Sequence, residues 1–139
     1  MPSKKTDERS TPDILFNSLH KEFNFQIDLA ASNENHKLPI FCTKENSAFN
    51  FPWNGRCFLN PPYSEIYKWL QYASKQIGLL VVILPCDTST RWFHDFIWDC
   101  TIHASRPGIQ LRFPKGRYKF GNYVTSPKFA TIIAVMRHE

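Results

Sequence analysis

The hydrophobic and polar positions along the chain predict helices and strands in alternation. Apolar residues recur at helical spacing from Pro12 to about Glu22, and a second helix is expected from about Ser64 to Gln76. A third helix is expected from Thr90 to Trp98. The segments with strand character are Phe25–Ala30, Ile40–Cys42, Arg56–Leu59, Leu79–Leu84, Thr101–Ala104, Ile109–Phe113 and Phe129–Met136.

One strand is expected at the centre of the sheet. Leu79–Leu84 contains no polar residue, which is typical of a parallel strand covered on both faces. Strands alternating with helices favour an α/β fold with a mostly parallel sheet and helices on both faces. At 139 residues the chain suits a single domain, expected over residues 11–139. Residues 1–10 are polar and charged, and they are expected to form a flexible N-terminus.

A stiff corner follows the strand Arg56–Leu59. In Asn60-Pro61-Pro62-Tyr63, neither proline can donate a ladder hydrogen bond, so the strand must end there. The residue before a proline is restricted to an extended conformation, which places Asn60 at the carboxyl end of the strand. Open α/β sheets bind their ligands at that end. The corner therefore offers an amide and an aromatic ring to a planar ligand.

The corner carries the groups needed to alkylate an exocyclic amino group. Such a nitrogen is a poor nucleophile, because its lone pair is delocalised into the ring. Acceptors for its N–H bonds would direct the lone pair at an electrophile, and the Asn60 side-chain carbonyl and the Pro61 carbonyl provide two. Tyr63 could stack on the base, a contact worth about 1–3 kcal/mol. The alternative is that the corner is a simple strand-terminating turn.

The charge of the chain suits a polyanionic partner without requiring one. Its formal net charge is +5, and its isoelectric point is near 9.1. A basic strip interleaved with aromatic residues is typical of phosphate contacts, although the same alternation fits a strand with one wet and one buried face. Arg91 and Trp92 either contact DNA or begin a packed helix. The cations of the strip are Arg112, Lys115, Arg117 and Lys119.

The four cysteines are expected to be reduced, buried and small hydrophobic residues. They show no C-x-x-C spacing, and no paired histidines stand at metal-ligand spacing, so no metal site is expected. The first ten residues lack the apolar stretch of a signal peptide, and no apolar run is long enough to span a membrane. We therefore expect a cytoplasmic protein.

The corner and its surroundings resemble a known family. Asn60–Tyr63 is similar to the [DNS]-P-P-[YF] motif of amino-group methyltransferases, and the chain more closely resembles the small phage DNA N-6-adenine methyltransferases of the Dam type. Nearly the whole chain carries this resemblance. Its residues are Thr11-Pro12, Leu15-Phe16, Phe25–Ser32, Asn35, Phe41–Glu45, Trp53–Gly55, Asn60–Tyr63, Trp69, Leu84-Pro85, Thr88, Thr90–Phe93, Lys115–Arg117 and Lys119–Gly121.

The resemblance implies a compact Rossmann-like methyltransferase that binds S-adenosylmethionine and methylates N6 of adenine in DNA. The target base would be flipped into a pocket at Asn60–Tyr63, because a duplex hides N6. It also implies that the cofactor is bound by Thr11, Asp28, Ala30, Ala31 and Asn35.

Two of these cofactor residues also have structural interpretations. Thr11 fits an N-cap, and Asp28 fits the cap of a following helix. The chain departs from the usual glycine-rich cofactor motif at Ala31-Ser32, and from the family pattern at Asn46–Ala48.

Two other functions use the same residues. A methyltransferase acting on RNA or on a protein glutamine faces the same electronic problem, because an amide nitrogen also has a delocalised lone pair. The chain could also be an inactive nucleic-acid-binding remnant of the fold. Kinship with phage proteins places the expected activity in the cytoplasm of a bacterial host.

Overall fold

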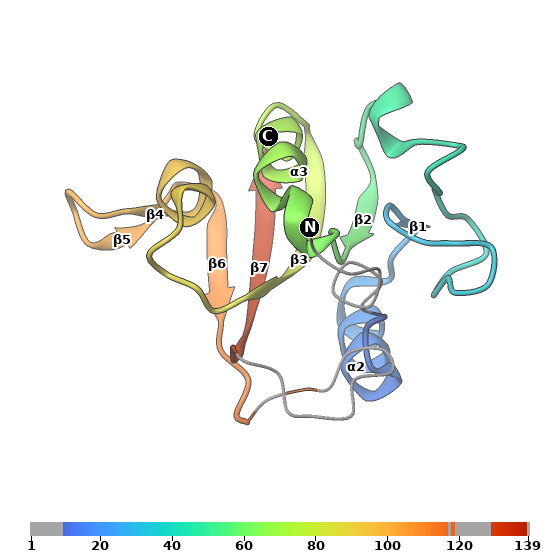
Figure 1. Ribbon diagram of the computed structural model, residues 1–139, viewed down its shortest axis with the longest axis horizontal. Helices are drawn as coiled ribbons and strands as arrows, with labels where there is room; N and C mark the ends of the chain where they lie inside the picture. The colour runs from blue at the N-terminus through green and yellow to red at the C-terminus, as the bar shows by residue number, and fades with distance from the viewer. Residues whose placement is uncertain (1–9, 117, 119–128, 139) are drawn as a thin grey trace.

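The fold is a mixed α/β arrangement around a central sheet (Figure 1). The computed structural model describes residues 10–116, 118 and 129–138. Among them, the sheet has five strands in the order β1-β2-β3-β7-β6. The strands are β1 Ile27–Asp28, β2 Arg56–Leu59, β3 Gly78–Pro85, β6 Ile109–Arg112 and β7 Thr131–His138, and a separate hairpin pairs β4 Trp98–Asp99 with β5 Ala104–Ser105.

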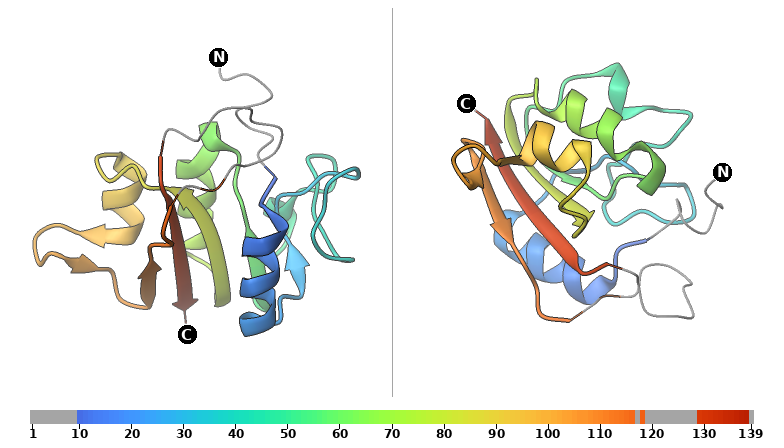
Figure 2. Two further views of the ribbon diagram at one scale, coloured as in Figure 1. Left: turned by 90° about the horizontal axis from the view of Figure 1, so that it is seen from below. Right: turned by 60° about the vertical axis from the view of Figure 1, so that its left-hand side comes forward.

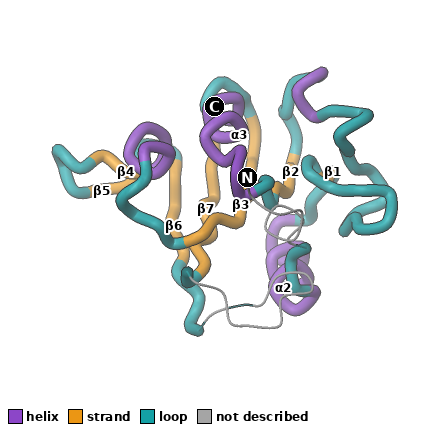
Figure 3. The backbone as a smooth tube through the Cα atoms, in the orientation of Figure 1, coloured by secondary structure: helices purple, strands orange, loops and turns teal. Residues whose placement is uncertain are grey.

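Helices lie before β1 and between the strands from β1 to β4 (Figure 3), and they are of three kinds. The tube view also shows that the segment between β1 and β2 is mostly loop. The described helices are all too short or too polar to span a lipid bilayer. They are the α-helices α2 Asp13–Phe23 and α3 Ile66–Ala73, the 3-10 helices η1 Ala48–Asn50 and η2 Tyr63–Glu65, and the π-helix η3 Phe93–Ile97.

The sheet is mixed, so the expectation of a mostly parallel sheet is only partly met. β1–β2 and β2–β3 are parallel pairs, whereas β3–β7 and β7–β6 are antiparallel. The final strand lies between β3 and β6 and runs opposite to both. An unbroken apolar run indicates burial on both faces, but it carries no information about strand direction.

Helices cover both faces of the sheet, as the sequence predicted (Figure 2). On one face, α2 packs its buried side chains against Phe58, Val81 and Ile133. On the other face, α3 and η3 pack against alternate residues of the same strands, including Leu59 and Val82. The buried face of α3 is the predicted one and consists of Ile66, Trp69, Leu70 and Ala73.

Several predicted elements differ from the structure in length or place. The strand expected over Phe25–Ala30 is reduced to Ile27–Asp28, and Phe41 adds a single parallel bridge to Asp28. The strand expected at Thr101–Ala104 is wrong, because residues 100–103 form a turn before β5. Asp99 closes that turn by accepting hydrogen bonds from the backbone N–H and the hydroxyl of Thr101.

The cysteines follow the prediction in part. Cys42 and Cys57 are buried, whereas Cys86 is half-buried and Cys100 is exposed, and all four are free thiols. Burial raises the pKa of the Cys57 thiol to about 11, so this residue behaves as a small hydrophobic side chain at neutral pH.

The Arg112 guanidinium joins β6 to the last turn of α2. It donates to both carboxylate oxygens of Glu22 at 2.6 Å and from Nε to Gln110 Oε1 at 2.9 Å, and it lies 5.1 Å from the Phe23 ring centroid. This bidentate hydrogen bond lowers the pKa of Glu22. A carboxylate with a lowered pKa in the folded state stabilises the fold above its unfolded-state pKa and loses that effect as pH falls through the folded pKa.

Replacing Glu22 with Gln should therefore lower the free energy of unfolding at pH 7, by about 0.5 kcal/mol for a pair exposed to solvent. Urea unfolding at pH 7 and pH 3 would measure this effect, and the difference from wild type should shrink at pH 3. Glu34→Gln is the matched control, because Glu34 is exposed and forms no ion pair among the described residues. A difference that stays the same at pH 3 would contradict the role of the Glu22 charge.

Candidate active site

The corner Asn60-Pro61-Pro62-Tyr63 stands at the carboxyl end of β2, as its sequence predicted. β2 ends at Leu59, and Tyr63 opens the 3-10 turn η2 that leads into α3. A cleft of about 350 Å³, including its opening to solvent, lies beside the corner. Its lining comes from the corner (Asn60, Pro61, Tyr63), from Ile66, from the end of β3 (Ile83, Leu84, Pro85) and from the start of β7 (Phe129, Ala130, Thr131).

Sequence reasoning missed the β7 side of this cleft. Because β2 and β3 are parallel, their carboxyl ends meet at one edge of the sheet. β7 is antiparallel to β3 and pairs Thr131 with Pro85, so the beginning of β7 lies at that same edge. Only the direction of β7 places residues 129–131 there, and their apolar pattern does not specify that direction.

Thr11 lies beside the corner and contacts it directly. The Asn60 Nδ2 donates to Thr11 Oγ1 at 3.1 Å, across 49 residues of sequence, and Thr11 is only 4% exposed. The N-cap prediction for Thr11 is wrong, because Pro12 occupies that position and no side chain caps the helix. Instead, the Pro12 carbonyl accepts from the backbone N–H groups of Leu15 and Phe16 at 3.1 and 3.0 Å.

Asp28 ends β1 next to β2, and the N–H of the following Leu29 donates to the Phe58 carbonyl at 3.0 Å. The Asp28 side chain is 4% exposed and accepts the Lys37 backbone N–H at 3.0 Å. Burial raises the pKa of this carboxyl, and backbone N–H donors from Lys37 and Ala30 partly offset that effect. Asp28 therefore closes the loop that follows β1. No helix begins directly after β1, since the next one, η1, starts only at Ala48, so the helix-cap interpretation is wrong.

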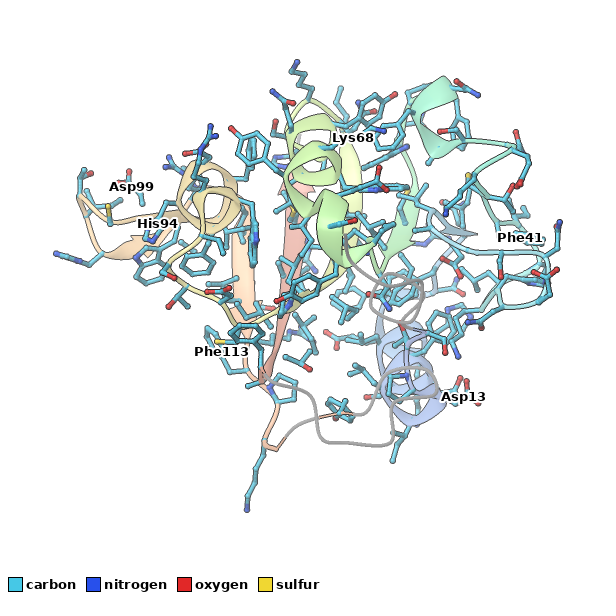
Figure 4. All side chains as sticks on the ribbon, in the orientation of Figure 1. Asp13, Phe41, Lys68, His94, Asp99 and Phe113 are labelled. Atoms are coloured by element: carbon cyan, nitrogen blue, oxygen red, sulfur yellow. The ribbon has the colours of Figure 1, made fainter. Side chains whose placement is uncertain are left out.

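The other cofactor candidates lie on this loop. Ala30 and Ala31 are half-buried, and the Ala31 N–H donates to the Cys42 carbonyl at 2.9 Å. Asn35 is exposed, and its backbone N–H is bound by Ser32 Oγ at 3.0 Å. The Lys37 ammonium reaches Asp13, labelled in Figure 4, at 2.6 Å, which ties the loop to the start of α2.

The residues that the sequence proposed for DNA binding differ in exposure and in pairing. Trp92 is buried in the core, so the packed-helix interpretation holds for it. The Arg91 side chain is 83% exposed and lies 4.9 Å from the Tyr67 ring centroid. The guanidinium of Arg112 is bound to Glu22, whereas Lys115 is exposed. Arg117 and Lys119 lie outside the described residues.

Metal ligation is not apparent in the part of the chain that the structure describes. No group of three or more His, Cys, Asp or Glu side chains stands at a metal-binding distance there. The polar groups at the cleft are instead an amide, two hydroxyl-bearing side chains and backbone carbonyls, which suit hydrogen bonding to a neutral planar ligand.

Comparison with known proteins identifies the family. The family model for DNA N-6-adenine-methyltransferase (Dam) matches residues 1–107. A DNA N-6-adenine-methyltransferase from Haemophilus phage HP1 is 35% identical in an alignment 100 residues long, which covers 66% of this chain and 58% of the phage protein. No solved structure matches the chain. With Asn60–Tyr63 inside the matched region, the chain belongs to the DNA N-6-adenine-methyltransferase (Dam) family.

Proposed function

We propose that this protein transfers a methyl group from S-adenosylmethionine to N6 of adenine in DNA. The observation that carries the proposal is the Asn60–Tyr63 corner, which lines a cleft at the carboxyl ends of two parallel strands in a chain of this family. We also propose that strands β1 to β3 form a ligand-binding edge like that of a Rossmann-like fold, and that residues 11–139 form a single domain. The parallel β1–β2 and β2–β3 pairs and the helices on both faces of the sheet support this proposal.

The chemistry follows from the acceptors at the corner. The base amino group donates its two N–H bonds to Asn60 Oδ1 and to the Pro61 carbonyl, so that its nitrogen lone pair turns out of the ring plane. Tyr63 supports the ring by stacking. When bound, the cofactor would supply an electrophilic methyl group on a sulfonium, whose bond to sulfur would break as the new bond to N6 forms. Asn60 and Pro61 would hold the amino group in place, and the methylated nitrogen would then lose one proton to water.

The residues after β1 fit a cofactor of this kind. Ala30 and Ala31 have small side chains, which allow a ligand close to the backbone, and Asn35 offers an exposed amide. Asp28 acts here by holding the loop through its bond to the Lys37 N–H, so we propose a supporting role for its carboxylate. Thr11 remains a candidate cofactor ligand only through its position beside Asn60.

The DNA would be held by exposed cations while the adenine is flipped into the cleft. Arg91 and Lys115 suit this role because both are exposed. Arg117 and Lys119 remain candidates from the sequence. Arg112 is better explained as the partner of Glu22, and Trp92 as a core residue. The expected setting is the cytoplasm of a bacterial host.

The test is a transfer assay with tritiated S-adenosylmethionine and three substrates: duplex DNA, RNA and a glutamine-containing protein. We expect label in DNA alone, recovered as N6-methyl-2′-deoxyadenosine from digested nucleosides, and no further label in DNA already methylated at every site. Label in RNA or protein would show that the amino-group chemistry is right and the substrate is wrong. Calorimetry that detects no cofactor binding, together with no transfer, would indicate an inactive nucleic-acid-binding remnant.

A further inference from the structure

The Arg91 side chain, just before η3, lies against the start of α3. Its guanidinium is 4.9 Å from the Tyr67 ring centroid, and its Nη2 stands 3.4 Å from the Tyr67 hydroxyl and 3.8 Å from Asp95 Oδ2. The side chain nevertheless stays 83% exposed. We propose that Tyr67 is a positioning residue, whose ring holds the Arg91 guanidinium beside the cleft so that it binds one backbone phosphate of the DNA. This inference rests on the proposed function.

These contacts hold the Arg91 guanidinium without using up its hydrogen-bond donors. A guanidinium carries five N–H donors, and the described residues accept from only one of its nitrogens, at the long distance of 3.4 Å from Nη2 to the Tyr67 hydroxyl. The Asp95 carboxylate stands beyond hydrogen-bond distance, and its attraction is screened because both side chains are exposed to solvent. The donors of Nε and Nη1 therefore remain for a phosphate, which arginine binds through two parallel bonds.

The Tyr67 ring is a fixed support. A carboxylate only accepts and a guanidinium only donates, so the Tyr67 hydroxyl must donate to Asp95, at 2.7 Å, and accept from Arg91. The bond to Asp95 raises the pKa of the Tyr67 phenol, which keeps its proton at neutral pH. The ring also meets the edge of the Phe96 ring, with 4.9 Å between centroids, and packs against the core. A long, exposed arginine is thus held against a surface that is itself anchored.

Tyr67 and Arg91 both adjoin segments that line the cleft. Tyr67 lies in the first turn of α3, directly after Ile66, and Arg91 comes shortly after Pro85 at the end of β3. A DNA strand that leads a flipped adenine into the cleft carries a backbone phosphate on each side of that nucleotide. A cation held beside the cleft is therefore suited to a nearby phosphate, and such contacts fix the register of a protein on DNA.

Salt dependence tests the phosphate contact. With a fluorescent DNA duplex, Arg91→Ala should lower the slope of log association constant against log salt by about 0.9, and it should weaken binding about eightfold at about 0.1 M salt, because one phosphate contact fewer releases counterions. Lys75→Ala is the matched control and should keep the wild-type slope. Lys75 is exposed, forms no ion pair among the described residues, and follows α3 at the end far from the corner. An unchanged slope in Arg91→Ala would overturn the proposal.

A double-mutant cycle tests the role of Tyr67. Tyr67→Leu removes the ring and should weaken DNA binding about two- to fivefold, the effect of one exposed cation–π contact, whereas Tyr67→Phe keeps the ring and should stay close to wild type. In the R91A background, Tyr67→Leu should change the affinity by less than about 1.5-fold, because the residue through which it acts is gone. An equal loss in both backgrounds would overturn the proposal. Equal losses from leucine and phenylalanine would also overturn it, since the ring would then not be the support.

These binding measurements need no methyl transfer, so they separate this inference from the proposed function. A protein that methylates DNA, while its Arg91→Ala variant binds DNA with the wild-type slope, would refute the phosphate contact alone. A protein that methylates none of the three substrates, yet loses slope in Arg91→Ala, would support the phosphate contact and refute the proposed function.

Discussion

Replacing Asn60 with alanine should lower methyl transfer by at least about 10²-fold, and by up to about 10³-fold, which is the usual cost of removing one preorganised polar group from an active site. The variant loses the side-chain acceptor that the target amino group needs, while the Pro61 carbonyl remains. The effect should fall on kcat, because the acceptor matters most as charge develops on the nitrogen. Single-turnover transfer of tritiated methyl to duplex DNA would measure it.

Three controls make the Asn60 result specific. Cofactor binding by calorimetry should be close to wild type, and the thermal midpoint should fall only slightly, because Asn60 is half-buried and lies at the edge of the core. Asn17→Ala is the matched variant, since Asn17 is exposed on the solvent face of α2 and should transfer methyl normally. Near-normal turnover by the Asn60→Ala variant would show that the mechanism is wrong.

The corner was predictable because its signals are local. Two consecutive prolines end β2 abruptly, and the residue before a proline must be extended. Asn60 could therefore be placed at the end of the strand without knowledge of the rest of the fold. The apolar run of β3 was equally clear, since a strand without polar residues must be covered on both faces. The buried face of α3 followed from helical spacing alone.

The contacts that complete the site were not predictable, because they join distant segments. The residues that follow Thr11 in the sequence predicted that it caps a helix. Only the packing of α2 beside β2 brings Thr11 to Asn60. Arg112 lay in a basic strip, yet its guanidinium meets Glu22 from 90 residues away. The antiparallel direction of β7 places Phe129–Thr131 in the cleft. The hydrophobic pattern predicts which residues are buried. The contact partners of a side chain and the direction of a strand depend instead on how the whole sheet assembles.

Replacing Tyr63 with alanine should lower kcat/KM by about 5- to 150-fold, which corresponds to the 1–3 kcal/mol of one base–aromatic stacking contact. Tyr63 begins η2 immediately after the corner, is half-buried and lines the cleft. Its ring is therefore positioned by the same prolines that position Asn60. A steady-state assay over a range of DNA concentrations would measure the loss, with Tyr63→Phe as the matched control that keeps the ring and removes the hydroxyl.

The two Tyr63 variants separate stacking from hydrogen bonding. If the ring supports a flipped adenine, Tyr63→Phe should keep most of the activity, and Tyr63→Ala should also alter the fluorescence of DNA carrying 2-aminopurine at the target position, because an unsupported base returns more often to the stack. Equal losses in both variants would assign the effect to the hydroxyl. Unchanged fluorescence with reduced transfer would mean that the ring acts after flipping, by holding the amino group against the acceptors of Asn60 and Pro61.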